Sequence, residues 1–239
     1  MANVVKNIVK MSKITTLPLF VEKTANGGRR VTVLDFNRII PMPASLNMES
    51  GNFEYFAIEA ALRKDAVLRY KFSQLKSIPE MSDWDYAMKL AKYDKSEDIL
   101  CQIGRQYIDN QIRYGATTWY EWRPKNWGTK WNAGETRRLD ADTIMFDTPW
   151  SAPEQVIAQL ARMYPDIEVE HWWADGDMGY NAGRARYVGG KLFERLCHTP
   201  CSNEAYETYT LCWGERECLY QDETGVWKRR NCDECHGCD

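Results

Sequence analysis

The sequence predicts an α+β fold, in which a ferredoxin-like antiparallel sheet carries helices on one face, with a helical insertion and a Cys-rich C-terminal tail. Three observations support this prediction. Strand-like segments surround one helix-like segment between residues 118 and 188, helical periodicity runs through residues 52–114, and seven of the eight cysteines lie beyond residue 196. A helix between antiparallel strands is typical of α+β domains and of the split βαβ unit.

The N-terminal segments contribute the first strands. Val4–Met11 alternates loosely and predicts a strand, whereas Thr16–Glu22 predicts a short helix. The Asn-Gly-Gly sequence at residues 26–28 predicts a turn. Val31–Ile40 predicts a second strand that ends at Pro41, because proline cannot donate to a ladder.

The insertion at residues 52–114 predicts three helices. Asn52, Ser82 and Ser96 are suitable N-caps, and Pro79 interrupts the first periodic run. Gly115 follows the last helix, where a left-handed residue commonly ends a helix.

The central stretch predicts four strands and a helix. Thr118–Arg123 is rich in aromatic and β-branched residues, and Asp142–Phe146 is a second short run. Ser151 has capping-box spacing to a glutamate and opens a helix that reaches Met163. Ile167–Trp173 and Arg184–Val188 complete the sheet.

The predicted domain organisation is a ferredoxin-like domain over residues 1–190, with the insertion at about 52–114, and a tail or small subdomain over residues 191–239. Within the tail, Lys191–Leu196 predicts a helical turn. Thr208–Trp213 and Gly225–Lys228 predict a small hairpin.

Three blocks of the sequence are distinctive: residues 119–133, which contain Trp-Gly-Thr-Lys-Trp, residues 146–153 and residues 36–43. The first resembles the most recognisable motif of the YubB-like family of plasmid- and phage-encoded proteins, and the other two resemble further blocks of that family. The resemblance spans roughly residues 3–188 and implies a ferredoxin-like domain and a mobile-element habitat. It implies no catalytic residue.

Composition narrows the class of protein. The net charge is −3 and 44% of residues are hydrophobic, which predicts a packed core and argues against a strongly basic nucleic-acid binder or a highly acidic DNA mimic. No apolar run approaches the length of a membrane span, and the N-terminus lacks a continuous apolar signal core. We therefore expect a cytoplasmic protein.

The Trp127-Gly-Thr-Lys130-Trp131 string is the candidate binding motif. Two indoles and a cation could form an exposed platform for a partner. The favoured alternative is a tight turn whose indoles pack on the sheet while Lys130 is exposed. His171 is expected on the sheet surface in a salt-bridged patch, and general acid–base chemistry is the alternative role.

The tail cysteines predict a structural zinc site. The pairs Cys197/Cys201 and Cys232/Cys235 have spacings that suit tetrahedral chelation, and reduced thiols are the alternative.

Two functional hypotheses follow. The first is a non-enzymatic accessory protein of a mobile element that binds a host protein and counters a host defence system. The second is a nucleic-acid-binding module that uses the sheet face or the basic clusters Arg137-Arg138 and 228–230. The sequence sets neither the partner nor the oligomeric state.

Overall fold

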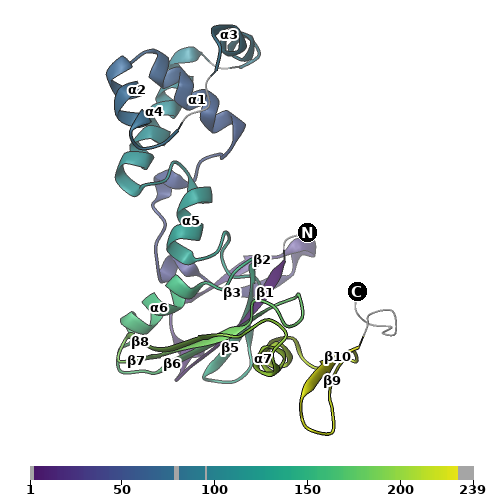
Figure 1. Ribbon diagram of the computed structural model, residues 1–239. Helices are drawn as coiled ribbons and strands as arrows, with labels where there is room; N and C mark the ends of the chain where they lie inside the picture. The colour runs from purple at the N-terminus through teal and green to yellow at the C-terminus, as the bar shows by residue number, and fades with distance from the viewer. Residues whose placement is uncertain (1–2, 78–80, 95, 231–239) are drawn as a thin grey trace. The chain divides into compact units, whose positions relative to one another are not determined.

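The computed structural model describes residues 3–77, 81–94 and 96–230 (Figure 1). The chain divides into two compact units. The sheet unit comprises Met1–Pro41 and Asn126–Asp239, and the helical unit comprises Met42–Lys125. The helical unit is therefore wider than the insertion that the sequence predicted at 52–114.

The sheet unit is built on an antiparallel six-stranded sheet with the order β4-β5-β1-β6-β7-β8. β1 (Val4–Met11) lies between β5 (Thr143–Pro149) and β6 (Val169–Asp175) and is antiparallel to both. β5 and β6 are consequently parallel to each other, and α6 (Glu154–Met163) connects them. This arrangement is a split βαβ unit, so the predicted ferredoxin-like topology is confirmed.

The far edge of the sheet is formed by a hairpin. β7 (Gly183–Val188) pairs with β6 and with β8 (Lys191–Cys197). Gly189 and Gly190 connect β7 to β8 with φ angles of 59° and 71°, a two-residue turn that favours glycine at both positions. The prediction of a helical turn at Lys191–Leu196 is wrong, because Gly-Gly closes a hairpin and residues 191–197 extend the sheet.

The opposite edge and the sheet's attachments are short. β4 (Arg137–Arg138) pairs with β5. A separate two-stranded ribbon joins β2 (Phe20–Thr24) to β3 (Arg30–Leu34). The predicted helix at Thr16–Glu22 and the predicted continuation of a strand to Ile40 are wrong: a 3-10 turn over Phe36–Arg38 follows β3, and the side chain of Asp35 caps it.

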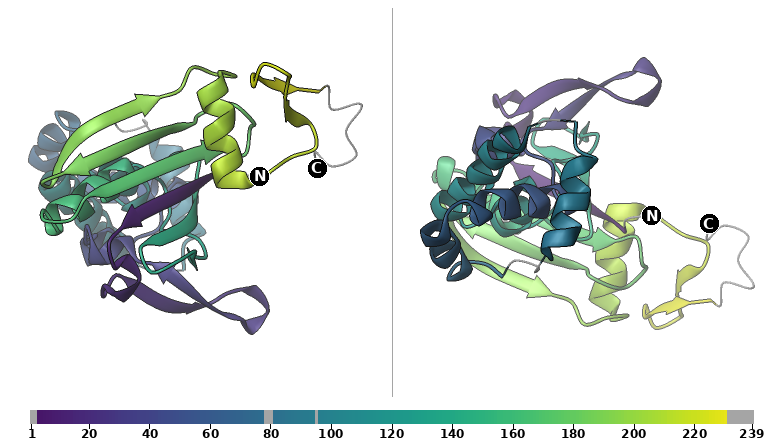
Figure 2. Two further views of the ribbon diagram at one scale, coloured as in Figure 1. Left: turned by 90° about the horizontal axis from the view of Figure 1, so that it is seen from below. Right: turned by 90° about the horizontal axis from the view of Figure 1, so that it is seen from above.

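Alternation along β1 sends side chains to two covered faces. The face that bears Val9 is buried, and α6 packs on this side of the sheet over β6, β7 and β8 with apolar side chains that include the fully buried Leu160. The opposite face, bearing Ile8, packs against α7 (Asn203–Trp213). Figure 1 shows the sheet between these helices, and Figure 2 shows α7 crossing the strands.

The position of α7 corrects two predictions for the tail. Thr208–Trp213 is helical because Ser202 caps a helix that continues through residue 213, with its hydroxyl accepting the Ala205 N–H at 3.2 Å. The C-terminal hairpin instead pairs β9 (Leu219–Gln221) with β10 (Trp227–Arg229). Part of the predicted tail therefore belongs to the core of the sheet unit.

The helical unit contains five helices within the described part of the chain. They are α1 (Asn52–Arg63), α2 (Ala66–Ser73), α3 (Asp83–Ala91), α4 (Glu97–Tyr114) and α5 (Trp119–Trp127), the last of which extends into the sheet unit. α1 and α4 approach closely at Gly104, where an added Cβ would lie 1.9 Å from the carbonyl oxygen of Ala57. Ser82 and Ser96 cap α3 and α4 as predicted, and Gly115 ends α4 at a φ of 66°.

The predicted strand at Thr118–Arg123 is wrong, because these residues begin α5. The hydroxyl of Thr118 accepts the Tyr120 N–H at 3.3 Å, as an N-cap does. Glu121 stands three residues later, and its carboxylate accepts the Thr117 N–H at 3.2 Å. The Thr-x-x-Glu sequence is thus a helix-start signal that outweighs the β-propensity of the aromatic residues.

Candidate interaction surface

The binding motif begins with a residue that belongs to the core. Trp127 is fully buried, its indole N–H donates to the carbonyl of Ile40 at 2.9 Å, and its ring meets Phe36 edge-on. Gly128 follows at a φ of 79°, and an added Cβ would lie 2.1 Å from Oε1 of Gln155. Trp127 therefore fixes the position of the motif and does not itself face a partner.

The next residues of the motif stand between two anchors. The Thr129 hydroxyl donates to the carbonyl of Pro149 at 2.9 Å, and the Asn132 amide donates to Asp35 at 2.7 Å. Between these anchors Trp131 is 46% exposed, with the Lys130 ammonium 5.7 Å from its ring centroid. The prediction that Trp131 is packed is wrong, because its neighbours, and not its indole, hold the loop to the sheet unit.

Trp150 lies beside this loop and is the least expected feature of the sheet unit. Its φ angle is 67°, in the left-handed region that bulky side chains rarely occupy. Its indole is 56% exposed. A non-glycine residue in this region costs about 1–3 kcal/mol and persists only where its surroundings hold it.

Several hydrogen bonds hold Trp150 in this conformation. Its N–H donates to the carbonyl of Asn3 at 2.8 Å, and its carbonyl accepts the side-chain amide of Asn181 at 3.4 Å. On the next residue, the Ser151 hydroxyl donates to the carbonyl of Gly128 at 2.6 Å, and its carbonyl accepts the Thr148 hydroxyl at 2.8 Å. The network orders the backbone while much of the indole remains in solvent.

Ser151 has a different role from the predicted one. Its hydroxyl bonds to the carbonyl of Gly128 and does not cap α6, which begins at Glu154 with Pro153 at the N-cap position. The predicted helix exists, but its capping box does not form.

Further residues with positive φ lie in the segments that meet Trp150. Asn181, which bonds to the Trp150 carbonyl, has a φ of 41°. Cys201 has a φ of 58°, and its N–H donates to the carbonyl of Gly179 at 2.9 Å. Backbone conformations of this kind cluster at binding and active sites.

We define the Trp150 rim as Lys130, Trp131, Trp150 and Tyr180. Tyr180 is 44% exposed, and a hydrogen bond with Cys201 raises the pKa of its phenol. The four side chains come from segments that are hydrogen-bonded to one another, and they combine three partly exposed aromatic rings with one cation. Such a set can bury aromatic area and donate hydrogen bonds to a partner.

The core of the sheet unit contains a buried polar chain. His171 Nε2 and Asn7 Oδ1 are 3.0 Å apart, and the Asn7 amide donates to the Thr148 hydroxyl at 2.9 Å. Burial lowers the pKa of His171 from 6.5 to about 3. The prediction of a surface histidine is wrong, because His171 lies on the sheet face that α6 covers and its relative exposure is 0%.

Two of the four predicted zinc ligands lie within the described residues. Cys197 ends β8 and Cys201 lies in the loop before α7, and both are exposed cysteines outside any disulfide. Cys232 and Cys235 lie outside the described residues. Within residues 3–77, 81–94 and 96–230, no three histidine, cysteine or acidic side chains form a group that could hold a metal ion.

Sequence reasoning identified Lys130 and Trp131 but missed Trp150 and Tyr180. The Trp150 segment carried a signal, since Pro149 and Pro153 surround it and indicate irregular backbone. The position of an exposed indole in a left-handed conformation depends on Asn3 and Asn181, which are remote in sequence, so no local pattern encodes it.

Comparisons with known proteins agree with this fold. Residues 126–211 match the family described as a ferredoxin-like domain in Api92-like protein, so this part of the sheet unit is a ferredoxin-like domain. Over 88 residues the chain is 32% identical to the uncharacterized protein YubB of Escherichia coli (strain K12). That alignment covers 34% of this chain, and the chain spans 59% of the length of this curated relative.

One solved structure is also similar. The crystal structure of a protein api92 from Yersinia pseudotuberculosis aligns with a TM-score of 0.37 at 12% identity, covering 83% of this chain and 99% of that chain. The predicted resemblance to YubB is supported by the 32% identity over 88 residues, and that relative is itself uncharacterized. In the described ranges, no helix has the length and apolar character that crossing a membrane requires.

Proposed function

We propose that this protein is a non-catalytic binding protein that contacts a partner protein through the Trp150 rim. The observation that carries the proposal is the Trp150 backbone, which is held in a costly conformation while its indole stays 56% exposed. Trp and Tyr are among the residue types that contribute most to binding at protein interfaces. The one histidine that the sequence suggested for acid–base chemistry is buried, which supports a non-catalytic role.

Binding of nucleic acid is less well supported. On the α7 side of the sheet, Arg184 forms an ion pair with Glu194 at 3.2 Å, and Arg186 pairs with Glu168. The charges of these two arginines are already neutralised, and binding to nucleic-acid phosphates would require both ion pairs to break. In the tail, Lys228 lies 3.8 Å from Asp222, so this basic cluster is also partly balanced.

The biological setting of the proposal rests on the sequence resemblance. We propose that the partner is a host protein met in the host cytoplasm, and that the protein serves a phage or plasmid as an accessory factor. Interference with a host defence system is the specific form of this proposal. The similarity to uncharacterised relatives is compatible with this setting.

The test is quantitative capture from a bacterial lysate treated with nuclease. Three baits are compared: the wild-type chain, Trp150→Gly and Trp84→Ala. Trp84 is 70% exposed in the helical unit and serves as a matched indole control. We expect a discrete protein to be retained by the wild type and the control, and Trp150→Gly to weaken its binding by at least about thirtyfold, as loss of a hot-spot residue does.

Two results would overturn the proposal. Loss of all captured material after nuclease treatment would indicate a nucleic-acid ligand. Equal retention by Trp150→Gly and the wild type would show that the rim is not the contact surface.

A further inference from the structure

The helical unit contains a cavity that is independent of the Trp150 rim. Its volume is about 690 Å³, and it lies where the segment before α1 and the first turn of α1 meet the first turn of α5. The lining includes three aromatic and three acidic side chains, namely Tyr55, Trp119, Tyr120, Glu49, Glu54 and Glu121. No function proposed above uses this site.

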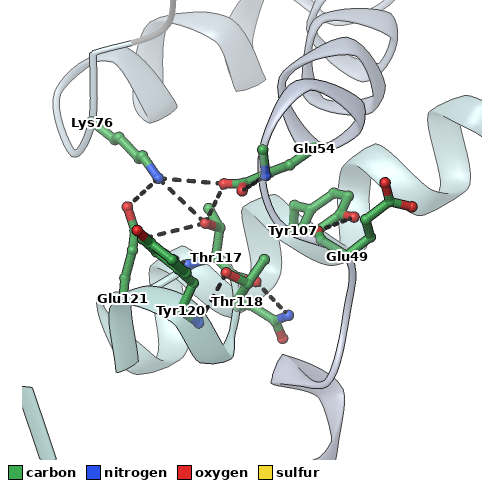
Figure 3. A network of polar contacts seen from close by, with 10 residues as sticks. Glu49, Glu54, Lys76, Tyr107, Thr117, Thr118, Tyr120 and Glu121 are labelled. Atoms are coloured by element: carbon green, nitrogen blue, oxygen red, sulfur yellow. Dashed lines mark hydrogen bonds and ion pairs between the residues drawn. The ribbon is translucent and has the colours of Figure 1, made fainter. Parts of the chain in front are cut away.

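The side chains around the cavity have a net negative charge, even after the ion pairs among them are counted. Lys76 Nζ lies 3.4 Å from Glu54 and 2.6 Å from Glu121, so one ammonium is shared by two carboxylates (Figure 3). Thr117 donates its hydroxyl to Glu54 at 2.5 Å and its N–H to Glu121 at 3.2 Å. The shared pair retains one net negative charge, Glu49 adds another to the lining, and the Arg123 guanidinium over the Trp119 ring offsets one of the two.

The Glu121 carboxylate stays ionised. Burial alone would raise the pKa of Glu121, but the hydrogen bonds from Lys76 and Thr117 outweigh it and leave this pKa below its usual value. The side chain of Glu54 is only 4% exposed and receives Lys76 directly. A fixed negative potential therefore faces the cavity at neutral pH.

The aromatic lining is arranged to meet a cation. The rings of Trp119 and Tyr120 are 5.6 Å apart with an interplanar angle of 71°, so they form two walls of a corner. The ring of Trp119 already contacts one cation, because the guanidinium of Arg123 lies 4.9 Å from the ring centroid. Tyr120 is 46% exposed and also lines the cavity.

The hydrogen bonds at Glu54 and Glu121 favour a cation that needs no hydrogen bond of its own. A guanidinium prefers a carboxylate with two available oxygens. Both oxygens of Glu121 accept hydrogen bonds from Lys76 and Thr117, and both oxygens of Glu54 also accept hydrogen bonds. A quaternary ammonium needs no hydrogen bond and is stabilised by aromatic faces and nearby negative charge. We propose that this cavity binds a trimethylammonium group.

Two sources can supply that group, a small molecule such as choline or a trimethylated lysine side chain. The experiment titrates the full-length chain with choline and follows the indole N–H resonance of Trp119, assigned with Trp119→Phe. An uncharged isostere of choline, 3,3-dimethylbutan-1-ol, is titrated in parallel. Tighter binding of a trimethyllysine peptide than of choline would identify a protein source, and equal or weaker binding would identify a small molecule.

Matched variants complete the test. Tyr120→Leu keeps apolar volume but removes the aromatic face, and Glu121→Gln keeps the side-chain size but removes the charge and one of the two acceptor oxygens. We expect each to weaken choline binding about tenfold, whereas Tyr70→Leu, at a 69% exposed tyrosine on α2, leaves it unchanged. Absence of a saturable shift with choline, equal saturation by the uncharged isostere, or full binding by Tyr120→Leu would overturn the proposal.

Discussion

Trp150 offers a test of backbone strain that is separate from binding. Alanine and glycine both remove the indole at this position, so the comparison of Trp150→Ala with Trp150→Gly isolates the effect of a Cβ at a φ of 67°. A Cβ in the left-handed region costs about 1–2 kcal/mol. The greater freedom of glycine in the unfolded chain offsets about 0.4–1 kcal/mol of that difference.

The glycine variant should therefore be more stable than the alanine variant by about 0.5–1 kcal/mol. At the exposed Glu207 in the middle of α7, the same comparison should favour alanine by about 1 kcal/mol, because glycine weakens a helix interior. Native-state hydrogen exchange of the β1 amides measures both pairs in the sheet unit alone. An alanine variant as stable as the glycine variant at position 150 would refute the claim that this backbone is strained.

Four further outcomes are expected. The folded state disfavours protonated His171, because its pKa is about 3 in the folded chain and 6.5 in the unfolded chain. The free energy of unfolding should therefore fall by about 1.4 kcal/mol per pH unit as the pH drops from 6.5 to 3. Acid titrations of unfolding should show that His171→Gln removes this slope. Leu160→Asp places an unpaired charge under α6 and should lower the free energy of unfolding by several kcal/mol; an unchanged melting temperature would show that α6 packs elsewhere. Trp127→Ala should cost about 3–5 kcal/mol, whereas Trp131→Ala should cost less than half as much in the same denaturation assay. The tail cysteines should hold zinc, and elemental analysis showing less than about a tenth of an equivalent, with all thiols titratable, would contradict a closed tetrahedral site.

The fold was largely predictable because most of its sheet is patterned locally. Val4–Met11 and Arg184–Val188 alternate, and the apolar residues of α6 repeat at helical spacing, so their types follow from periodicity. The errors arose where short signals competed. Aromatic residues suggested a strand at Thr118–Arg123, although the Thr-x-x-Glu cap begins a helix there.

The candidate surface was less predictable than the fold. Trp127 and Trp131 are separated by only three residues and have similar neighbours in sequence, yet one is buried and the other is 46% exposed. The difference arises from contacts with Ile40 and Pro149, which are distant in the chain. Contacts with residues that are far away in the sequence, and not the residue type, determine which indole is buried and which is exposed.

The most direct measurement of the central claim is site-specific cross-linking from the rim. A photoreactive phenylalanine analogue replaces Trp131 in the full-length chain, and the same analogue replaces Tyr70 as an exposed control in the helical unit. We predict a cross-link to a single protein from position 131, its loss when Trp150→Gly is added, and no such product from position 70. A cross-link to nucleic acid, or a product that is unchanged by Trp150→Gly, would contradict the assignment of the Trp150 rim as a protein-binding surface.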